Sequence, residues 1–144
     1  MKSFPLISIA MCTYNGELFL REQLESLVNQ DYPNLEIRIR DDMSSDKTWQ
    51  IIQDFQGKYT FIHCIQNKNR LGFQKNFEEV FQDCQGIWIA PSDQDDIWSL
   101  DKISKLFSKT TDNIMVYHDS VLVDENNKTL DTNMSKIFNF ISGQ

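Results

Sequence analysis

The sequence predicts an α/β protein with an open, mostly parallel sheet and helices on both of its faces. Two observations lead to this fold class. Short apolar runs typical of strands alternate along the chain with segments whose apolar residues recur at helical spacing. In addition, no repeat, low-complexity tract or linker interrupts this alternation, and 144 residues amount to one domain.

The first part of the chain provides two strands and two helices. Residues 6–12 form a short apolar run, which predicts the first strand. Leucines and a valine recur at helical spacing within residues 17–29, so a helix is expected there with Leu24 buried. Apolar and charged residues alternate over 35–40, which predicts a second strand with one wetter face. A helical stripe over 49–55 follows.

The later elements continue the same pattern. The third helix is expected to bury Phe77. In order, the sequence predicts a strand at 59–65, a helix at 77–84, a buried strand at 87–90, a helix at 103–107, a strand at 114–117 and a short strand at 121–123. The polar segment 125–128 predicts a turn.

An acidic segment follows the fourth predicted strand directly. Asp93, Asp95 and Asp96 put three carboxylates within four residues. Carboxylates this close repel one another unless a cation compensates them, and hard oxygen ligands suit Mg²⁺ or Mn²⁺. The segment therefore indicates a divalent metal that carries a phosphorylated substrate. A solvated acidic loop or a helix start remains the alternative, since Asp is common at both.

Polar segments follow three strands that are expected to end at one edge of the sheet, where ligands bind in open α/β folds. Tyr14 offers a ring face for a base, Asp42 can accept from a base N–H, and Arg70 can meet phosphates. Each has a plainer interpretation, as a packed turn residue, a helix cap and a solvated cation respectively. The converging residues are Thr13, Tyr14 and Asn15 after the first strand, Asp41 and Asp42 after the second, and Asp93 and Asp95 after the fourth.

Composition narrows the possible partners and the compartment. The net charge is −7 and no basic stripe is present, which argues against nucleic acid as a partner. No apolar run reaches the roughly 18 residues needed to span a bilayer. Cys12, Cys64 and Cys84 are widely spaced and lie in or beside apolar runs, so we expect reduced packing residues in a cytoplasmic protein.

Four sequence blocks together resemble the family 2 glycosyltransferases, which have the Rossmann-like GT-A fold. The resemblance covers about residues 5–125, and the Asp-Gln-Asp-Asp-Ile-Trp segment is most similar to rhamnosyltransferase-type members. The blocks are Ile7–Gly16, Ile37–Thr48, Asn69–Phe73 with Asn76, and Ser92–Trp98.

The resemblance implies an inverting transfer from a UDP- or dTDP-sugar to a glycan or lipid-linked acceptor in bacterial surface polysaccharide synthesis. The enzyme would be cytoplasmic, with peripheral association at the inner face of the membrane. The resemblance assigns Thr13, Tyr14, Asn15, Asp41, Asp42, Arg70 and Asp93 to the nucleotide-sugar, and Asp95 with Asp93 to Mn²⁺ or Mg²⁺. Among these, Thr13 and Tyr14 would lie beside the base, with Asp42 accepting from the pyrimidine.

The general base of the family lies well downstream of the metal motif. Asp119 and Asp124 are too close to that motif to match it, so the base is expected beyond Gln144. Residues 1–144 would then be an incomplete donor-binding domain, truncated at its C-terminus, that binds donor without transferring sugar. An unfinished sheet leaves apolar surface, which suggests a homo-oligomer.

The residues alone also leave two other classes of function as alternatives. An Asp-based phosphatase also uses Asp-x-Asp after a strand, but usually after the first strand and before Gly-Thr. A non-catalytic nucleotide-binding or regulatory module, such as a phosphorylation receiver, needs an acidic acceptor after the third strand and a Lys after the fifth. Here Gln66 and His118 occupy those places.

Overall fold

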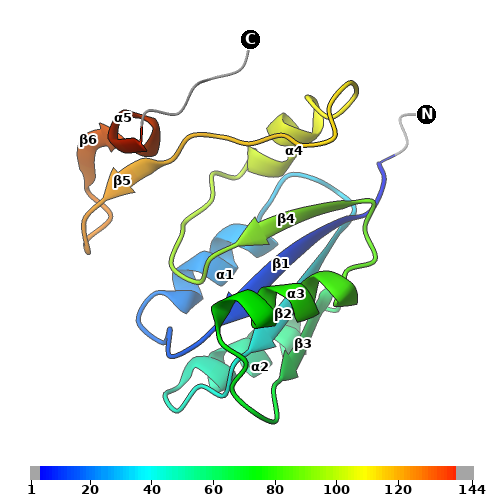
Figure 1. Cartoon of the computed structure of the whole chain (residues 1–144), viewed down its shortest axis with the longest axis vertical. Coiled ribbons are helices and arrows are strands. Elements are labelled where there is room, and N and C mark those ends of the chain that lie inside the picture. Colours follow the sequence, from blue (N-terminus) through cyan, green and yellow to red (C-terminus); the bar gives the residue numbers. More distant parts are fainter. Residues whose placement is uncertain (1–3, 139–144) are drawn as a thin grey trace. The chain divides into compact units, whose positions relative to one another are not determined.

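Four parallel strands form the central sheet, in the order β3-β2-β1-β4 (Figure 1). The computed structural model describes residues 4–138, in two compact units, Met1–Ser104 and Lys105–Gln144, and this sheet lies in the first. Its strands are β1 (Ile7–Thr13), β2 (Leu35–Asp41), β3 (Ile62–Gln66) and β4 (Trp88–Ser92). The chain steps outward from β1 to β3 and then returns to the other side of β1, which creates a switch point between β1 and β4.

Helices cover both faces of this sheet, as predicted. Helix α3 (Phe73–Asp83) packs on β1 and β2 from one face, and α1 (Leu20–Val28) and α2 (Thr48–Lys58) lie on the other (Figure 1). Because β1 is central and covered twice, its apolar residues are almost completely buried. This burial on both faces explains why β1 reads as a continuous apolar run rather than as an alternating one.

The buried stripe of α1 follows the predicted helical spacing. Leu20, Leu24 and Leu27 have no exposed surface, which confirms the burial expected for Leu24. On α3 the expectation was only partly correct, because Phe77 is half-buried. Its ring packs between Phe73 and Phe81 along the helix surface, with centroids 5.0 and 5.7 Å away.

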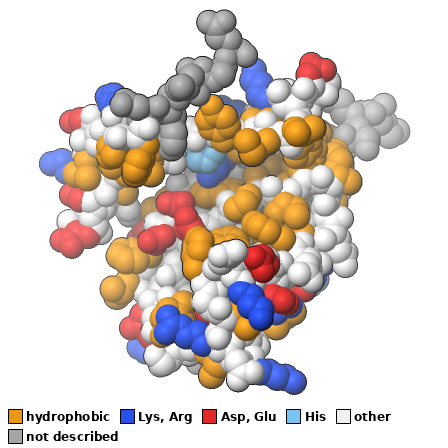
Figure 2. Space-filling model, viewed as in Figure 1, with side chains coloured by type: hydrophobic (Ala, Val, Ile, Leu, Met, Phe, Trp, Pro, Cys, Tyr) orange, Lys and Arg blue, Asp and Glu red, His pale blue; other side chains and the backbone are white. Residues whose placement is uncertain are grey.

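The prediction that the fourth strand is buried was wrong. β4 is the last strand in the sheet order, and one of its faces leaves Ile87 71% and Ile89 41% exposed. The physical reason is that α3 packs over β1 and β2 and does not extend to cover β4. Hydrophobic side chains accordingly gather over β4 and α3 on the face shown in Figure 2.

A small antiparallel sheet characterises the second unit. The turn between its strands is closed by a hydrogen bond from Asp124 N to Lys128 O (2.9 Å), as the polar segment predicted. The predicted strand at 114–117 was wrong, because this apolar run pairs with no other strand within residues 4–138, and Ile114 is 99% exposed. The elements are β5 (Val121–Val123), β6 (Thr129–Asn133) and α5 (Met134–Phe138), while α4 (Lys102–Phe107) begins before the boundary of the units.

Over residues 4–138, no helix has both the length and the apolar character that crossing a membrane requires.

The packing of α1 gives a direct test of the fold. We expect Leu24→Ala to lower the free energy of unfolding by about 2–5 kcal/mol, because it opens a cavity between α1 and the sheet. Leu18→Ala is the matched control, since Leu18 is 80% exposed. Urea unfolding followed by tryptophan fluorescence measures both variants, and all three tryptophans lie in the first unit. Equal effects of the two substitutions would contradict this packing.

Candidate functional site

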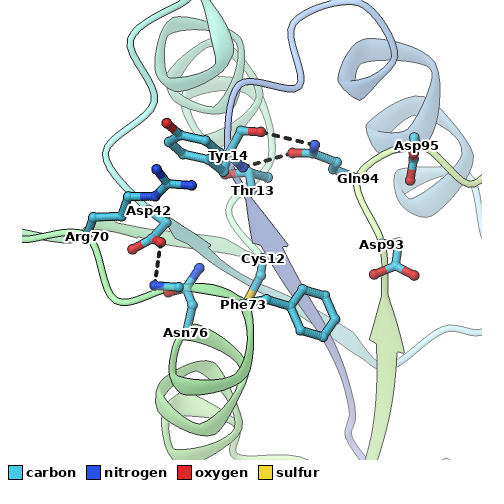
Figure 3. Close-up of a pocket in the computed structure, with 11 residues that line it drawn as sticks. Cys12, Thr13, Tyr14, Asp42, Arg70, Phe73, Asn76, Asp93, Gln94 and Asp95 are labelled. Carbon is cyan, nitrogen blue, oxygen red and sulfur yellow. Dashed lines mark hydrogen bonds between the residues drawn. The ribbon is translucent and has the colours of Figure 1, made fainter.

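A cavity of about 360 Å³ opens at the carboxyl ends of β1, β2 and β4 (Figure 3). Its position at the switch point is the place where open parallel sheets bind ligands. The lining residues are Cys12, Thr13, Tyr14, Asp42, Arg70, Gly72, Phe73, Asn76, Asp93, Gln94 and Asp95. The three segments expected to converge from strands 1, 2 and 4 therefore do so.

The loop after β1 is hydrogen-bonded to the loop after β2 and to the first residue of α2. Asn15 has φ 47°, and its side-chain Oδ1 accepts a hydrogen bond from Ser45 N at 2.8 Å. Gly16 N donates to Thr48 Oγ1 at 2.7 Å. These bonds fix the backbone on which Tyr14 is carried. Asn15 is thus placed in loop packing and does not line the cavity.

Asp41 is completely buried beneath this pair of loops. It accepts hydrogen bonds from Thr13 Oγ1 (2.9 Å), Ser44 N (3.0 Å) and Gln66 Nε2 (3.0 Å). A buried carboxylate needs such partners to offset its desolvation. Asp41 does not line the cavity, and its carboxylate is instead bonded to the surrounding loops.

Asp42 connects β2 to the loop before α3. Its Oδ1 accepts from Leu71 N (2.7 Å) and Asn67 Nδ2 (3.0 Å), and its Oδ2 accepts from Gly72 N (2.8 Å). Gly72 has φ 82°, a conformation that favours glycine and lets both N–H groups face the carboxylate. Burial raises the pKa of Asp42, but the hydrogen bonds and the Arg70 charge outweigh it, so the net pKa is lowered.

Arg70 lies over the ring of Tyr14. The guanidinium carbon is 3.9 Å from the ring centroid, a close cation–π contact. One face of the ring is therefore covered by a flat cation. Arg70, Tyr14 and Asp42 form one wall of the cavity, and Figure 3 shows Asp93 and Asp95 on the opposite wall.

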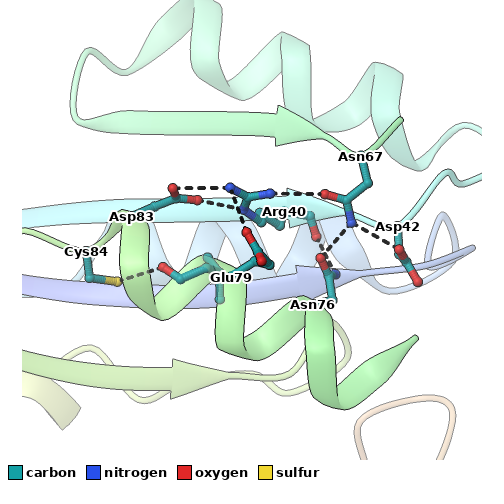
Figure 4. A network of polar contacts seen from close by, with 8 residues as sticks. Arg40, Asp42, Asn67, Asn76, Glu79, Asp83 and Cys84 are labelled. Carbon is teal, nitrogen blue, oxygen red and sulfur yellow. Dashed lines mark hydrogen bonds and ion pairs between the residues drawn. The ribbon is translucent and has the colours of Figure 1, made fainter. Parts of the chain in front are cut away.

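A polar network stiffens the floor beneath Asp42 (Figure 4). Asn67 Nδ2 is shared between Asp42 and Asn76 Oδ1, the latter at 2.8 Å, and Asn76 Nδ2 donates to Arg40 O at 3.1 Å. Arg40 in turn donates from Nε to Asp83 Oδ2 at 2.7 Å. The network joins β2, the loop before α3 and α3 itself, so the wall of the cavity cannot shift without α3.

The acidic segment forms the second wall at the end of β4. Gln23 of α1 anchors it, because Gln23 Nε2 donates to Ser92 Oγ at 2.6 Å and to Asp93 O at 3.3 Å. Burial, together with the charges of Asp96 and Asp95, raises the pKa of Asp93. A divalent cation would reduce the electrostatic repulsion between these neighbouring carboxylates.

The donor set fits a metal only in part. Asp93 and Asp95 both line the cavity. Within residues 4–138, however, no group of three or more His, Cys, Asp or Glu side chains is assembled to hold a metal ion. A hard cation such as Mg²⁺ typically keeps water and phosphate ligands beside one or two carboxylates, and this pair fits that arrangement.

Five lining residues were not among the predicted site residues, namely Cys12, Gly72, Phe73, Asn76 and Gln94. All five lie in the sequence blocks that carry the family resemblance, and this position was the signal in the sequence that could have identified them. Cys12 is a free thiol, as expected, and burial followed by the charge of Asp42 raises its pKa to about 12. It is therefore protonated and unreactive at neutral pH.

Comparisons with known proteins point to one family. The sequence model of the family described as Glycosyl transferase family 2 matches residues 8–143. The dTDP-rhamnosyl transferase RfbG of Shigella flexneri is 41% identical, over 65% of this chain and 34% of the relative. The UDP-Glc:alpha-D-GlcNAc-diphosphoundecaprenol beta-1,3-glucosyltransferase WfaP of Escherichia coli is 37% identical, over 69% of this chain and 39% of the relative.

Solved structures show the same fold. The crystal structure of residues 1–349 of S. aureus TarS in complex with UDP has a TM-score of 0.66 and 27% identity, over 71% of this chain and 31% of that chain. The mannosyltransferase PcManGT from Pyrobaculum calidifontis, in complex with GDP-Man and Mn²⁺, has a TM-score of 0.72 at 20% identity, over 85% of this chain and 37% of that chain. This chain spans about a third of the length of the first curated relatives it matches.

The hydrogen bonds of Asp42 generate a prediction for stability. Asp42→Asn turns one acceptor into an NH₂ group that must face Leu71 N–H or Gly72 N–H. We expect the free energy of unfolding to fall by about 1–3 kcal/mol. Asp54→Asn is the control, since its ion pair with Arg21 is long, at 3.8 Å, and half-exposed, and it should change stability by less than about 0.5 kcal/mol.

The sign of the pH dependence follows from the lowered pKa. A carboxylate with a folded pKa below its ordinary value of 3.8 stabilises the fold at higher pH and loses this effect as the pH falls through the folded pKa. The gap in urea midpoint between wild type and Asp42→Asn should therefore narrow in acid. A gap that stays constant down to pH values below the ordinary pKa would contradict the charge-assisted role.

Proposed function

Because the chain belongs to glycosyl transferase family 2, we propose that it forms the donor-binding part of an inverting glycosyltransferase. The single observation that carries the proposal is the cavity at the switch point, with its two unlike walls. One wall offers an aromatic ring, a guanidinium and a hydrogen-bonded carboxylate. The other offers two carboxylates at the end of β4. A nucleoside diphosphate has a base at one end and anionic oxygens at the other, and the two walls are complementary to these ends.

We propose that the base binds at the wall formed by Tyr14, Asp42 and Arg70. Three hydrogen bonds already occupy Asp42, and a carboxylate can accept about four, so capacity remains for one base N–H. Since Arg70 covers one ring face of Tyr14, the base would stack on the opposite ring face or enter between the ring and the guanidinium. Thr13 lies beside this wall.

We propose that Asp95, with Asp93, holds Mn²⁺ or Mg²⁺ against the diphosphate, and that Asp93 also lies on the ribose or sugar side. The bound cation would neutralise the charge that develops on the leaving diphosphate. The chain's own contribution is to hold both carboxylates on one wall, through the anchor of Gln23 at the end of β4. The raised pKa of Asp93 supports a site that favours a cation.

The relatives support a UDP- or dTDP-sugar as the donor. RfbG is described as a dTDP-rhamnosyl transferase and WfaP as a UDP-Glc-dependent glucosyltransferase, and TarS was solved with UDP and with UDP-GlcNAc. We propose a glycan or lipid-linked acceptor in surface polysaccharide synthesis, since the name of WfaP includes a diphosphoundecaprenol acceptor. With such an acceptor, the enzyme would act at the cytoplasmic face of the membrane.

We propose that these 144 residues bind donor and do not transfer sugar by themselves. The support is that the first curated relatives are about three times as long as the stretch they share with this chain. The general base and the acceptor site would then belong to residues outside this stretch. We also propose that the exposed apolar surface of β4 and α3 is a contact surface of a homo-oligomer.

Titration calorimetry with UDP and dTDP, each with and without Mn²⁺, tests this function. We expect metal-dependent binding of at least one nucleotide, because both walls are then engaged. Asp95→Asn should abolish the metal dependence while leaving the urea midpoint unchanged. Asp112→Asn is the matched control, because Asp112 is exposed and does not line the cavity. Undiminished Mn²⁺-dependent binding by Asp95→Asn would overturn the metal assignment.

The role of Tyr14 is tested by removing and then restoring its ring. Tyr14→Ala should weaken nucleotide binding by about 1–3 kcal/mol if the ring stacks on the base. Tyr14→Phe keeps the ring face and should bind within about threefold of wild type. The same calorimetric titration measures both variants. If Tyr14→Ala binds as tightly as wild type, Tyr14 is a packing residue of the loop.

A further inference from the structure

The side chain of Gln94 joins the two walls of the cavity. Its Oε1 accepts a hydrogen bond from Tyr14 N at 2.9 Å, and its Nε2 donates to Tyr14 O at 3.2 Å (Figure 3). Gln94 stands between the two carboxylates of Asp93 and Asp95, and 80 positions separate it from Tyr14 in the chain. One side chain thus connects the backbone that carries the aromatic ring to the backbone that carries both acids.

The chemistry of this pairing suits an amide, whose acceptor and donor stand side by side. The peptide group of Tyr14 presents one donor and one acceptor, so a single partner must accept and donate at once. A carboxylate can only accept, and an ammonium or guanidinium can only donate. Asn has the same amide but is shorter by one methylene. The Gln94 side chain spans the gap and satisfies both groups.

Gly16 provides the space that the Gln94 amide occupies. A Cβ atom at Gly16 would lie 2.5 Å from Gln94 Oε1 and 2.6 Å from its Cδ, which is closer than atoms can approach. The backbone of Gly16 is itself fixed by its hydrogen bond to Thr48 Oγ1. A methyl group there would push the flexible end of Gln94 away from Tyr14, while the backbone of the loop stays anchored.

We propose that Gln94 is a positioning residue that sets the distance between the base-binding wall and the metal-binding wall, an inference that rests on the proposed function. A nucleoside diphosphate then behaves as a ligand with two ends. When the two walls are fixed relative to each other, binding of the base raises the effective concentration of the diphosphate at the carboxylates. When Gln94 is lost, each wall still binds its own end, but the advantage of binding both together falls.

A positioning role predicts different losses for a ligand that uses one wall and a ligand that uses both, whereas a merely structural role predicts equal losses. Uridine has a base but no phosphate, so it uses one wall only. Gln94→Ala should weaken binding of UDP with Mn²⁺ by about tenfold, while uridine binding changes by less than about twofold. Calorimetry measures the first affinity, and chemical-shift titration measures the weaker second one. Gln53→Ala is the matched control, because Gln53 is an exposed residue of α2.

Gly16→Ala tests the same contact without altering Gln94. It should reproduce the loss seen for Gln94→Ala, because the added methyl group displaces the amide. The double variant should bind UDP with Mn²⁺ about as well as either single variant, since both break one interaction. Hydrogen exchange gives a readout without ligand, because the Tyr14 amide should lose protection in both variants but not in Gln53→Ala.

The outcomes separate the inference from the proposed function. If wild type binds neither UDP nor dTDP in the presence of Mn²⁺, the proposed function fails for this chain, and the inference fails with it. If wild type binds and the proposed function stands, three results overturn the inference. These are unchanged UDP binding in Gln94→Ala, equal losses for uridine and UDP, and additive losses in the double variant.

Discussion

The carboxylate of Asp42 is the group on which the rest of the site depends. It directly follows β2, and it accepts hydrogen bonds from Leu71 N, Gly72 N and Asn67 Nδ2, which belong to the segment before α3. Charge-assisted bonds to a buried carboxylate are about twice as strong as neutral ones, so this group holds the segment against the sheet. The guanidinium of Arg70 is carried by the same segment and reaches Tyr14 only because that segment is held.

Buried charge is compensated throughout this part of the molecule by side chains from neighbouring elements. Glu36 of β2 receives Ser8 Oγ of β1 and Arg38 Nε, and Arg40 lies between Asp83 and Asn67. The Ser8 contact joins β1 to β2 and the Asp83 contact joins β2 to α3, so these two contacts also fix the positions of the elements they connect. The open end of the sheet is different, because within residues 4–138 no Lys or Arg forms an ion pair with Asp93 or Asp95. A site with its charge compensated on one wall and uncompensated on the other suits a ligand that arrives with a metal.

Local pattern was enough to predict the four parallel strands and the convergence of their carboxyl ends, because both follow from the alternation of strand and helix. It was not enough to separate a central strand from an edge strand. Both Ile9 and Ile89 lie in apolar runs, but Ile9 is fully buried and Ile89 is 41% exposed. In the described sheet β1 lies between β2 and β4 and is covered by α3, whereas β4 is an edge strand that α3 does not cover. The apolar residues at 114–117 similarly met no partner strand, so their β-propensity had no ladder to join.

The sequence by itself determined which residue types stand at the strand ends, and therefore the class of ligand that we propose: an aromatic ring, acids and a basic residue at one edge of a parallel sheet. Only the tertiary structure decided which of them reach the cavity. Asp41 and Asp42 are adjacent and identical in chemistry, but the alternation of a strand end turns one into the loop packing and the other toward the cavity. The contact between Gln94 and Tyr14 is likewise a tertiary feature, because it depends on β4 returning beside β1 across a separation of 80 residues.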